Sequence, residues 1–532
     1  MNTLVGTGKL VRLILRRDRW VLPLWILWLI LIPVSLASAY QEQFPTAADR
    51  AEYARTAGTN PTFLALYGPL HDTSVGGIVA QRIGAIPLFI ALISVLIVIR
   101  HTRTEEQAGR RELLSAAVCG RHAGLAAALA VTMVANLVVG LFVGLGLRAE
   151  LPASGSLAVG LGFAAVGCVF AAVGGLAAQF TENAGSARGI AIGGIGAFFL
   201  IRLAADTGGE DSGLTWLNWL SPLGWVTEMR AFADERWWIA LLFAVCTVLV
   251  TLVAVLVSSR RDIGGGLLAA RLGPPDAPSW LGSPLGLAWR LHRTLLAGWL
   301  VTFAVLGAVF GGIAEGIGDL MKDNENLKDV FARMGGQQGL IDSYIASMMS
   351  LVGLVAAAYG IQAALKLRSE EEATRAEYLL TTTGRTPWVL SHLVFALLGP
   401  TAGLAVAGVS AGLVHGANSG DIGGQTPPIL GAAMVQLPAV WVLSGLALAL
   451  FALLPRMTAA AWGALGLCGI LGQFGRALEF DQKLLDISPF THVPQVPGND
   501  LTLGPILALL AIAAAFIATG LVRTRHRDIS AA

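Results

Sequence analysis

Two short stretches of the chain gather acidic and basic side chains at matching positions. They cover residues 103–114 and 368–379, at an offset of 265 residues, and each carries a glutamate pair, an arginine and an apolar edge. On a helix, Glu106 and Arg110 stand at i and i+4, as do Glu371 and Arg375, so each pair would lie on one face. Charged side chains of this kind, beside leucines, favour the docking of another protein over catalysis.

The candidate docking residues form two matched sets. They are Glu105, Glu106, Arg110, Arg111, Glu112, Leu113 and Leu114 in the first stretch, and Glu370, Glu371, Arg375, Glu377, Leu379 and Leu380 in the second. The alternative is a pair of solvated turns, whose exposed ion pairs each contribute little to stability. The repetition in both halves favours docking, because drift after a duplication would erase a merely solvated pattern sooner than a contact pattern.

Motifs for catalysis are absent from the sequence. Gly8-Lys9 is followed by Leu10, and Thr3 stands where the first glycine of a Walker A loop belongs, so the chain is not expected to hydrolyse ATP by itself. There is also no HExxH zinc motif. The eight histidines are scattered, and the four cysteines are isolated, which predicts neither a metal site nor a redox site. We expect this chain to bind no cofactor.

The composition predicts a membrane protein whose helices must position the charged stretches. Of the 532 residues, 55% are hydrophobic and only 13% are charged, with a mean hydropathy of +0.68. A hydrocarbon core needs about 20 apolar residues of helix. Twelve runs fit, and their approximate bounds are 21–40, 83–99, 123–147, 157–180, 189–205, 237–257, 294–314, 346–365, 389–414, 429–454, 458–474 and 503–522. The fold class is therefore an all-α polytopic membrane protein.

The distribution of lysine and arginine predicts the orientation of these spans. With both termini in the cytoplasm, most basic residues fall in cytoplasmic segments, as the positive-inside rule requires. Residues 3–19 mix apolar and basic side chains and predict an interfacial helix along the inner leaflet. Residues 280–293 are a candidate second interfacial helix.

Internal similarity divides the chain into two parallel six-span repeats. Besides the charged stretches, Gly120-Arg121 corresponds to Gly384-Arg385, and Ser221-Pro222 corresponds to Ser488-Pro489 before the last span of each half. We predict a first half at 1–257 with its charged loop at 100–122, a cytoplasmic linker at 258–293, and a second half at 294–532 with its charged loop at 366–388.

The interiors of the twelve predicted spans contain no Asp or Glu. A carrier driven by a proton or sodium gradient generally needs an ionisable group at membrane depth. This absence argues against a secondary carrier and favours a transporter that is driven from outside the membrane.

The charged loop after the second span, with its glutamate pair and its later Gly-Arg, resembles the coupling helix of ABC-2-type permeases. The Ser-Pro element before each last span is similar to the outer-leaflet re-entrant hairpin of that family, at Ser221, Pro222, Ser488 and Pro489. With both halves matched, the whole chain resembles the fused, twelve-span permeases of antibiotic and polyketide exporters of the tetronasin type, which have the type V exporter fold.

The resemblance implies a partner, a cargo and a location. Two copies of a separate ATP-binding subunit, which would hold ATP and Mg, would each grip one coupling loop. The cargo would be an amphipathic compound such as a drug or antibiotic, exported across a bacterial cytoplasmic membrane, with no role for nucleic acid. Gly109 and Arg111 are replaced by Thr374 and Ala376, so the second contact is expected to be the weaker one.

Two other functions remain open from the sequence. One is a proton-coupled twelve-span drug carrier, and the other is a membrane scaffold whose paired loops recruit cytoplasmic proteins without transport. For a transporter, Phe89, Met348, Met349 and Gln362 are candidate substrate contacts, because adaptable side chains suit varied ligands. Lipid exposure or core packing is the simpler interpretation of each.

Overall fold

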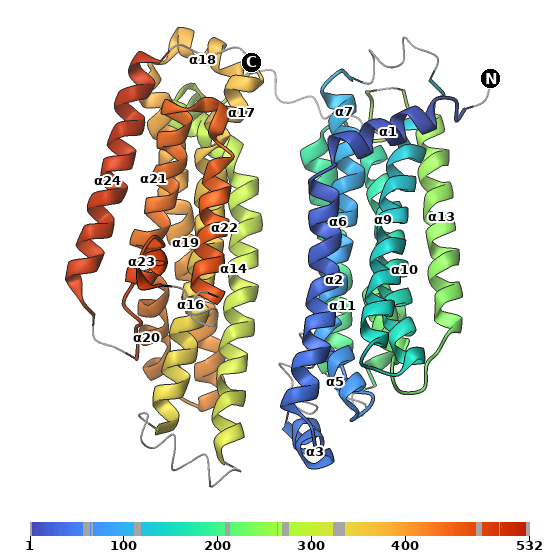
Figure 1. The fold of residues 1–532 in the computed structure, drawn as a ribbon. Helices are drawn as coiled ribbons and strands as arrows, with labels where there is room; N and C mark the ends of the chain where they lie inside the picture. The colour runs from blue at the N-terminus through green and yellow to red at the C-terminus, as the bar shows by residue number, and fades with distance from the viewer. Residues whose placement is uncertain are drawn as a thin grey trace. The chain divides into compact units, whose positions relative to one another are not determined.

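The computed structural model describes residues 3–56, 64, 67–110, 119–207, 213–262, 264–268, 276–322, 336–474, 481–498 and 501–527. These residues form helices and turns, with no strand among them, which confirms the all-α prediction (Figure 1). The chain divides into two compact units, Met1–Gly273 and Pro274–Ala532, which we call unit 1 and unit 2.

Eleven helices among the described residues are long and apolar enough to cross a membrane. In unit 1 they are α2 (Val21–Gln43), α5 to α7 (Val75–Gln107), α9 (Ala123–Arg148), α10 (Ala153–Phe180), α11 (Ala184–Thr207) and α13 (Trp238–Arg260). In unit 2 they are α14 (Pro284–Lys322), α16 (Gly336–Ala364, continued by α17), α19 (Arg385–Ser419), α20 and α21 (Ile422–Leu453) and α24 (Leu503–His526). The run at 458–474 forms α22 (Ala460–Phe474), which has 15 residues and falls short of that length.

Helix α10 is the centre of unit 1. It packs against α9, α11, α13 and α6 (Ile86–His101), and 19 of its 28 residues are buried. Small residues allow this close packing, because a Cβ placed at Gly140 of α9 would lie only 2.3 Å from the carbonyl oxygen of Gly160. Between α6 and α9, the Asn136 amide donates to Ser94 Oγ at 2.9 Å, which satisfies both polar groups inside the core.

Helix α21 (Leu437–Leu453) has the corresponding central place in unit 2. It packs against α16, α19, α22 and α24, while α14 lies along α19. A phenylalanine and a glycine fix the contact of α14 with α19, because the Phe303 ring would lie 2.4 Å from a Cβ at Gly403. The order of elements and the helix pairs therefore correspond in the two units.

Of the two segments predicted to be interfacial helices, only the first forms a helix separate from the span that follows it. Helix α1 (Thr7–Arg17) is separate from α2 and packs on α9 (Figure 1). In place of a second interfacial helix at 280–293, unit 2 has a short 3-10 turn, η4 (Ser279–Gly282), and then α14 runs without interruption from Pro284. The break between α1 and α2 lies at Asp18, whose carboxylate is held by Arg100 and His101 at the end of α6.

The segment after α13 belongs structurally to unit 1. The backbone N–H groups of Leu267 and Leu268 donate to the carbonyls of Gln179 and Phe180 at the end of α10, at 3.0 and 2.9 Å. Residues 264–268 thus lie against the spans, although they were predicted to belong to the cytoplasmic linker at 258–293.

Candidate functional site

The first charged element is α7 (Arg103–Gln107) with the turn up to Arg110. It follows α6 directly, and Thr102 Oγ1 donates back to the carbonyl of Val98 at 2.6 Å, which satisfies a carbonyl at the helix end. The helix stops after one turn because Gly109 has a φ of +68°, a left-handed conformation that glycine adopts without strain. The element lies at the same end of unit 1 as α1 (Figure 1).

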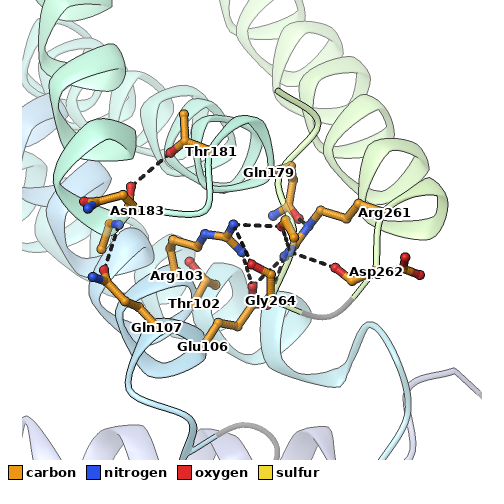
Figure 2. Close-up of polar contacts among 12 residues, drawn as sticks. Thr102, Arg103, Glu106, Gln107, Gln179, Thr181, Asn183, Arg261, Asp262 and Gly264 are labelled. Atoms are coloured by element: carbon orange, nitrogen blue, oxygen red, sulfur yellow. Dashed lines mark hydrogen bonds and ion pairs between the residues drawn. The ribbon is translucent and has the colours of Figure 1, made fainter. Parts of the chain in front are cut away.

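A buried ion cluster fixes α7 to the end of the last span of unit 1. Arg103, which is fully buried, donates to Glu106, and Arg261 donates to both carboxylate oxygens of Glu106 at 2.9 Å. Figure 2 shows the two guanidinium groups on either side of the Glu106 side chain. Arg261 is the first residue after α13. One carboxylate thus balances two buried cations, an arrangement that holds only while all three remain paired.

Backbone and side-chain oxygens accept the remaining hydrogen bonds of these arginines. Arg103 Nη2 and Arg261 Nη1 each donate to the carbonyl of Gly265 at 2.7 Å, and Arg261 Nε donates to Gln179 Oε1 at 2.7 Å. Burial, together with the positive charge of Arg121, lowers the pKa of Arg261 from its usual value. The Glu106 carboxylate is therefore needed at this point to stabilise the positive charge.

Helix α7 is also tied to the start of α11. Gln107 Oε1 accepts from the backbone N–H of Ala184 at 3.0 Å, and Arg188 donates to Thr104 Oγ1 at 3.0 Å. Figure 2 shows Gln107 pointing toward the start of α11. One short element thus contacts both the start of α11 and the residue that follows α13.

The second charged element is α17 (Lys366–Glu372) with α18 (Arg375–Thr382), and it has a related anchor. Glu371 is buried and accepts from Arg527, which directly follows α24, the last span of unit 2. Arg527 also donates to the carbonyl of Phe451 at 3.1 Å and lies over the Phe451 ring, 4.5 Å from its centroid. The glutamate at each matching position, Glu106 or Glu371, therefore pairs with the arginine that follows the last span.

A second pair of arginines supports both anchors. Arg121 donates to the carbonyls of Ser258 and Arg261, at 3.2 and 2.6 Å. Arg385 does the same in unit 2, with the carbonyls of Arg525 and Arg527. Gly120-Arg121 and Gly384-Arg385 stand out as a repeat in the sequence, but no role was predicted for them. Arg261 and Arg527 were not predicted, although their common place after the last span was a usable signal.

The glutamates and arginines at i and i+4 do not pair with each other. Arg110 contacts Glu105 at 3.3 Å, not Glu106, and Arg375 binds Glu370 through Nε and Nη2 at 2.8 and 3.0 Å, not Glu371. The hydrogen bonds with Glu370 raise the pKa of Arg375. The register changes because both elements break between the partners, at Gly109 and at Thr374, whose φ is +58°.

The predicted docking residues divide into buried and exposed groups. Glu106, Glu370 and Glu371 are buried and unavailable to a partner, whereas Arg110, Arg375 and Glu377 are exposed. Leu379 and Leu380 pack partly against the core of unit 2. Tyr378, which was not predicted, is 79% exposed. Arg111, Glu112, Leu113 and Leu114 lie outside the described residues.

The Ser-Pro elements form short helices between the fifth and sixth apolar helices of each unit. Ser221 caps α12 (Pro222–Glu228), accepts from Leu223 N at 3.2 Å and donates to the carbonyl of Phe198 at 2.8 Å. In unit 2, Ser488 is buried and precedes η6 (Pro489–His492), which follows α23 (Gln482–Leu485). Both elements pack on neighbouring spans, α12 on α10 and α11, and η6 on α22. Their depth in a bilayer stays a prediction.

The candidate substrate contacts are scattered over both units. Phe89 is exposed and its ring makes an edge contact with Trp28, and Gln362 is exposed and accepts from Trp299 Nε1 at 2.9 Å. Met348 is half-buried, but Met349 is 1% exposed and belongs to the core of unit 2. Met349 therefore has a packing role. Among the described residues, no three His, Cys, Asp or Glu side chains are grouped to hold a metal ion.

Comparison with known proteins gives two matches. Residues 281–525 match a family model described as the C-terminal domain of the multidrug efflux system permease Rv1217c. The multidrug efflux system permease protein Rv1217c of Mycobacterium tuberculosis (strain ATCC 25618 / H37Rv) is 42% identical over 530 residues, which are 98% of this chain and 95% of that protein. The similarity thus extends over both units.

Proposed function

The chain belongs to the family of the multidrug efflux system permease Rv1217c, and from this premise we propose that it is the membrane subunit of an ATP-driven exporter of the ABC-2 type. In this proposal it transports drug-like amphipathic compounds out of the cell. Two copies of a separate ATP-binding subunit supply the energy, with ATP and Mg bound in those subunits. Both chain termini then lie on the cytoplasmic side, where the two charged elements meet their partners.

The observation that carries the proposal is the anchoring of a charged element in each unit. A solvated turn has no need of a buried carboxylate, which is stable inside a protein only when it is paired. Removing one partner of such a pair costs about 3 to 5 kcal/mol. The pairs Glu106–Arg261 and Glu371–Arg527 make each element move with the end of its last span, as a part that receives force from a partner must do.

The exposed side chains of these elements give the partner its contacts. In unit 2 the contact surface is the outer face of α18, with Glu377 and Tyr378 exposed. In unit 1 it includes Arg110, half of whose side chain is exposed. Tyrosine is enriched among the residues that carry most of the binding energy at protein interfaces.

The test uses the chain co-expressed with its ATP-binding subunit and reconstituted in inverted membrane vesicles. We expect the double variant Glu377→Lys/Tyr378→Ala, and separately Arg110→Glu, to lower ATP-dependent drug uptake at least fivefold without loss of membrane insertion. Arg456→Glu is the matched control, because Arg456 is exposed beyond the end of α21 and outside the charged elements, and it should transport normally.

Two results would reject the proposal. One is unchanged ATP-dependent uptake in both variants. The other is drug transport by the purified chain alone, driven by a proton gradient, which would establish the carrier alternative. An absence of any drug transport in the presence of ATP and the partner would favour the scaffold.

A further inference from the structure

A cavity of about 360 Å³ lies where α1 turns into α2 and faces α9. Val11 and Leu15 of α1, Leu22 of α2, and Val131 and Val134 of α9 are among the apolar side chains that line it. Its volume is in the range of sites that hold small ligands. Val134 and Leu15 are about half exposed, so the cavity opens to the outside of unit 1 rather than into its core.

The wall of this cavity offers few polar groups to a ligand. Asp18 and Arg19 are the charged residues among those that line it, and both lie at the turn between the helices. Asp18 is already engaged, with Arg100 Nη2 3.1 Å from Oδ1 and with His101 Nε2 2.5 Å from Oδ2. The interior therefore suits a hydrocarbon chain and not a ligand with many hydrogen-bonding groups.

Three cations lie along one face of α1, and two of them, Arg12 and Arg16, directly follow the cavity-lining residues Val11 and Leu15 in the sequence. Lys9, Arg12 and Arg16 stand at i, i+3 and i+7, which places them on one helix face, and all three are exposed. None of them forms an ion pair with a residue that the structure describes. Arg17 differs, because it is paired with Glu105 at the first charged element. Lys9, Arg12 and Arg16 are thus free to bind an anion outside the protein.

We propose that this site binds one anionic phospholipid, with an acyl chain in the cavity and the phosphate against Arg12, Arg16 and Arg19. Clusters of basic residues next to a membrane-spanning helix attract anionic headgroups, and apolar side chains below them accommodate the chain. The turn between α1 and α2 makes the site. Unit 2 has no such turn among its described residues, because α14 is continuous from Pro284.

The position of the site connects the lipid with the first charged element. Arg17 joins α1 to Glu105, and Asp18 joins the start of α2 to the end of α6. A lipid that holds α1 in place would therefore also hold the residues from which α7 begins. The test below measures lipid binding alone, so its outcome is independent of the proposed ATP-driven transport.

The experiment titrates the purified full-length chain, in detergent, with palmitoyl-oleoyl phosphatidylglycerol or phosphatidylcholine and counts retained lipids by native mass spectrometry. We expect one phosphatidylglycerol to be retained at least tenfold more tightly than phosphatidylcholine. Each headgroup arginine contributes about fivefold in affinity, so Arg12→Gln/Arg16→Gln should weaken retention about 25-fold. Ala130→Phe, which fills the cavity from an exposed position of α9, should weaken it comparably.

Two control variants separate this site from general effects on the surface. Arg260→Gln removes an exposed cation at the end of α13, and Ala244→Phe enlarges an exposed side chain of the same helix, so both should retain the lipid. Equal retention of the two lipids, or retention unaffected by both site variants, would overturn the proposal. An uncharged amphipathic dye would also overturn it if the dye bound in the cavity, lost its binding in Ala130→Phe and kept it in the arginine variants. The cavity would then be a cargo site.

Discussion

Neutralising the carboxylate of Glu106, which joins α7 to the last span of unit 1, should lower the thermal stability far more than the same change at Glu105. In Glu106→Gln the shape of the side chain is kept and its charge is lost. Arg103 and Arg261 then remain buried and close together without the carboxylate that binds both, and only the more weakly acting charge of Glu182 still stabilises Arg103. In Glu105→Gln the lost partners are Arg17 and Arg110, which are both partly exposed to water.

The magnitudes follow from burial. Removing one member of a buried ion cluster costs about 3 to 5 kcal/mol. An exposed pair contributes about 1 kcal/mol or less. For a unit of this size, each kcal/mol of lost stability lowers the melting temperature by about 3 °C. We therefore expect Glu106→Gln to lower Tm by about 9 to 15 °C, and Glu105→Gln by about 3 °C or less.

The assay is thermal unfolding of the purified chain in detergent, followed by the far-ultraviolet circular dichroism of its helices. Glu105→Gln is the matched control, since it makes the same chemical change in the same helical turn. Equal shifts for the two variants, or a shift below about 3 °C for Glu106→Gln, would refute the reasoning that this cluster is a buried anchor.

Two further predictions concern backbone strain and pH. Thr374 holds a left-handed φ of +58° that costs a β-branched residue about 1 to 2 kcal/mol, so Thr374→Gly should raise Tm by a few degrees and Thr374→Val should not, as differential scanning fluorimetry would show. Burial and the charges of Arg230 and Arg236 lower the pKa of His71 to about 4. Because its unfolded pKa is higher, about 6.5, the stability contributed by the neutral imidazole is complete above pH 6.5 and is lost as pH falls toward 4. Tm measured over this range should therefore fall less in His71→Asn than in the unaltered chain; an identical fall would contradict the assignment.

The spans and their order could be predicted from the sequence because apolar length is a local property. The run at 503–522, for example, forms the core of α24 (Leu503–His526). The charged elements were located correctly, but their internal geometry was not. Whether Glu106 pairs with Arg110 depends on where a one-turn helix stops, and Gly109 alone does not determine that point.

The anchors themselves lie beyond the reach of local patterns. Glu106 and Arg261 are 155 residues apart, and Glu371 and Arg527 are 156 apart. Only folding brings such partners together, and a single charge at the end of a span is also what orientation in a membrane requires. The repeat offered a way to find them, since each arginine is the first residue after the last helix of its unit.

The attachment of residues 261 and 264–268 to the spans bears on how such a protein could exist as two polypeptides. A gene split directly after α13, at residue 260, would leave Glu106 without Arg261 and the end of α10 without the backbone donors of Leu267 and Leu268. A half-length ancestor, or an engineered half, would need a tail of about eight residues beyond its last membrane helix to be a self-sufficient protein. The second half needs a shorter tail, which must extend at least through Arg527, the first residue after α24.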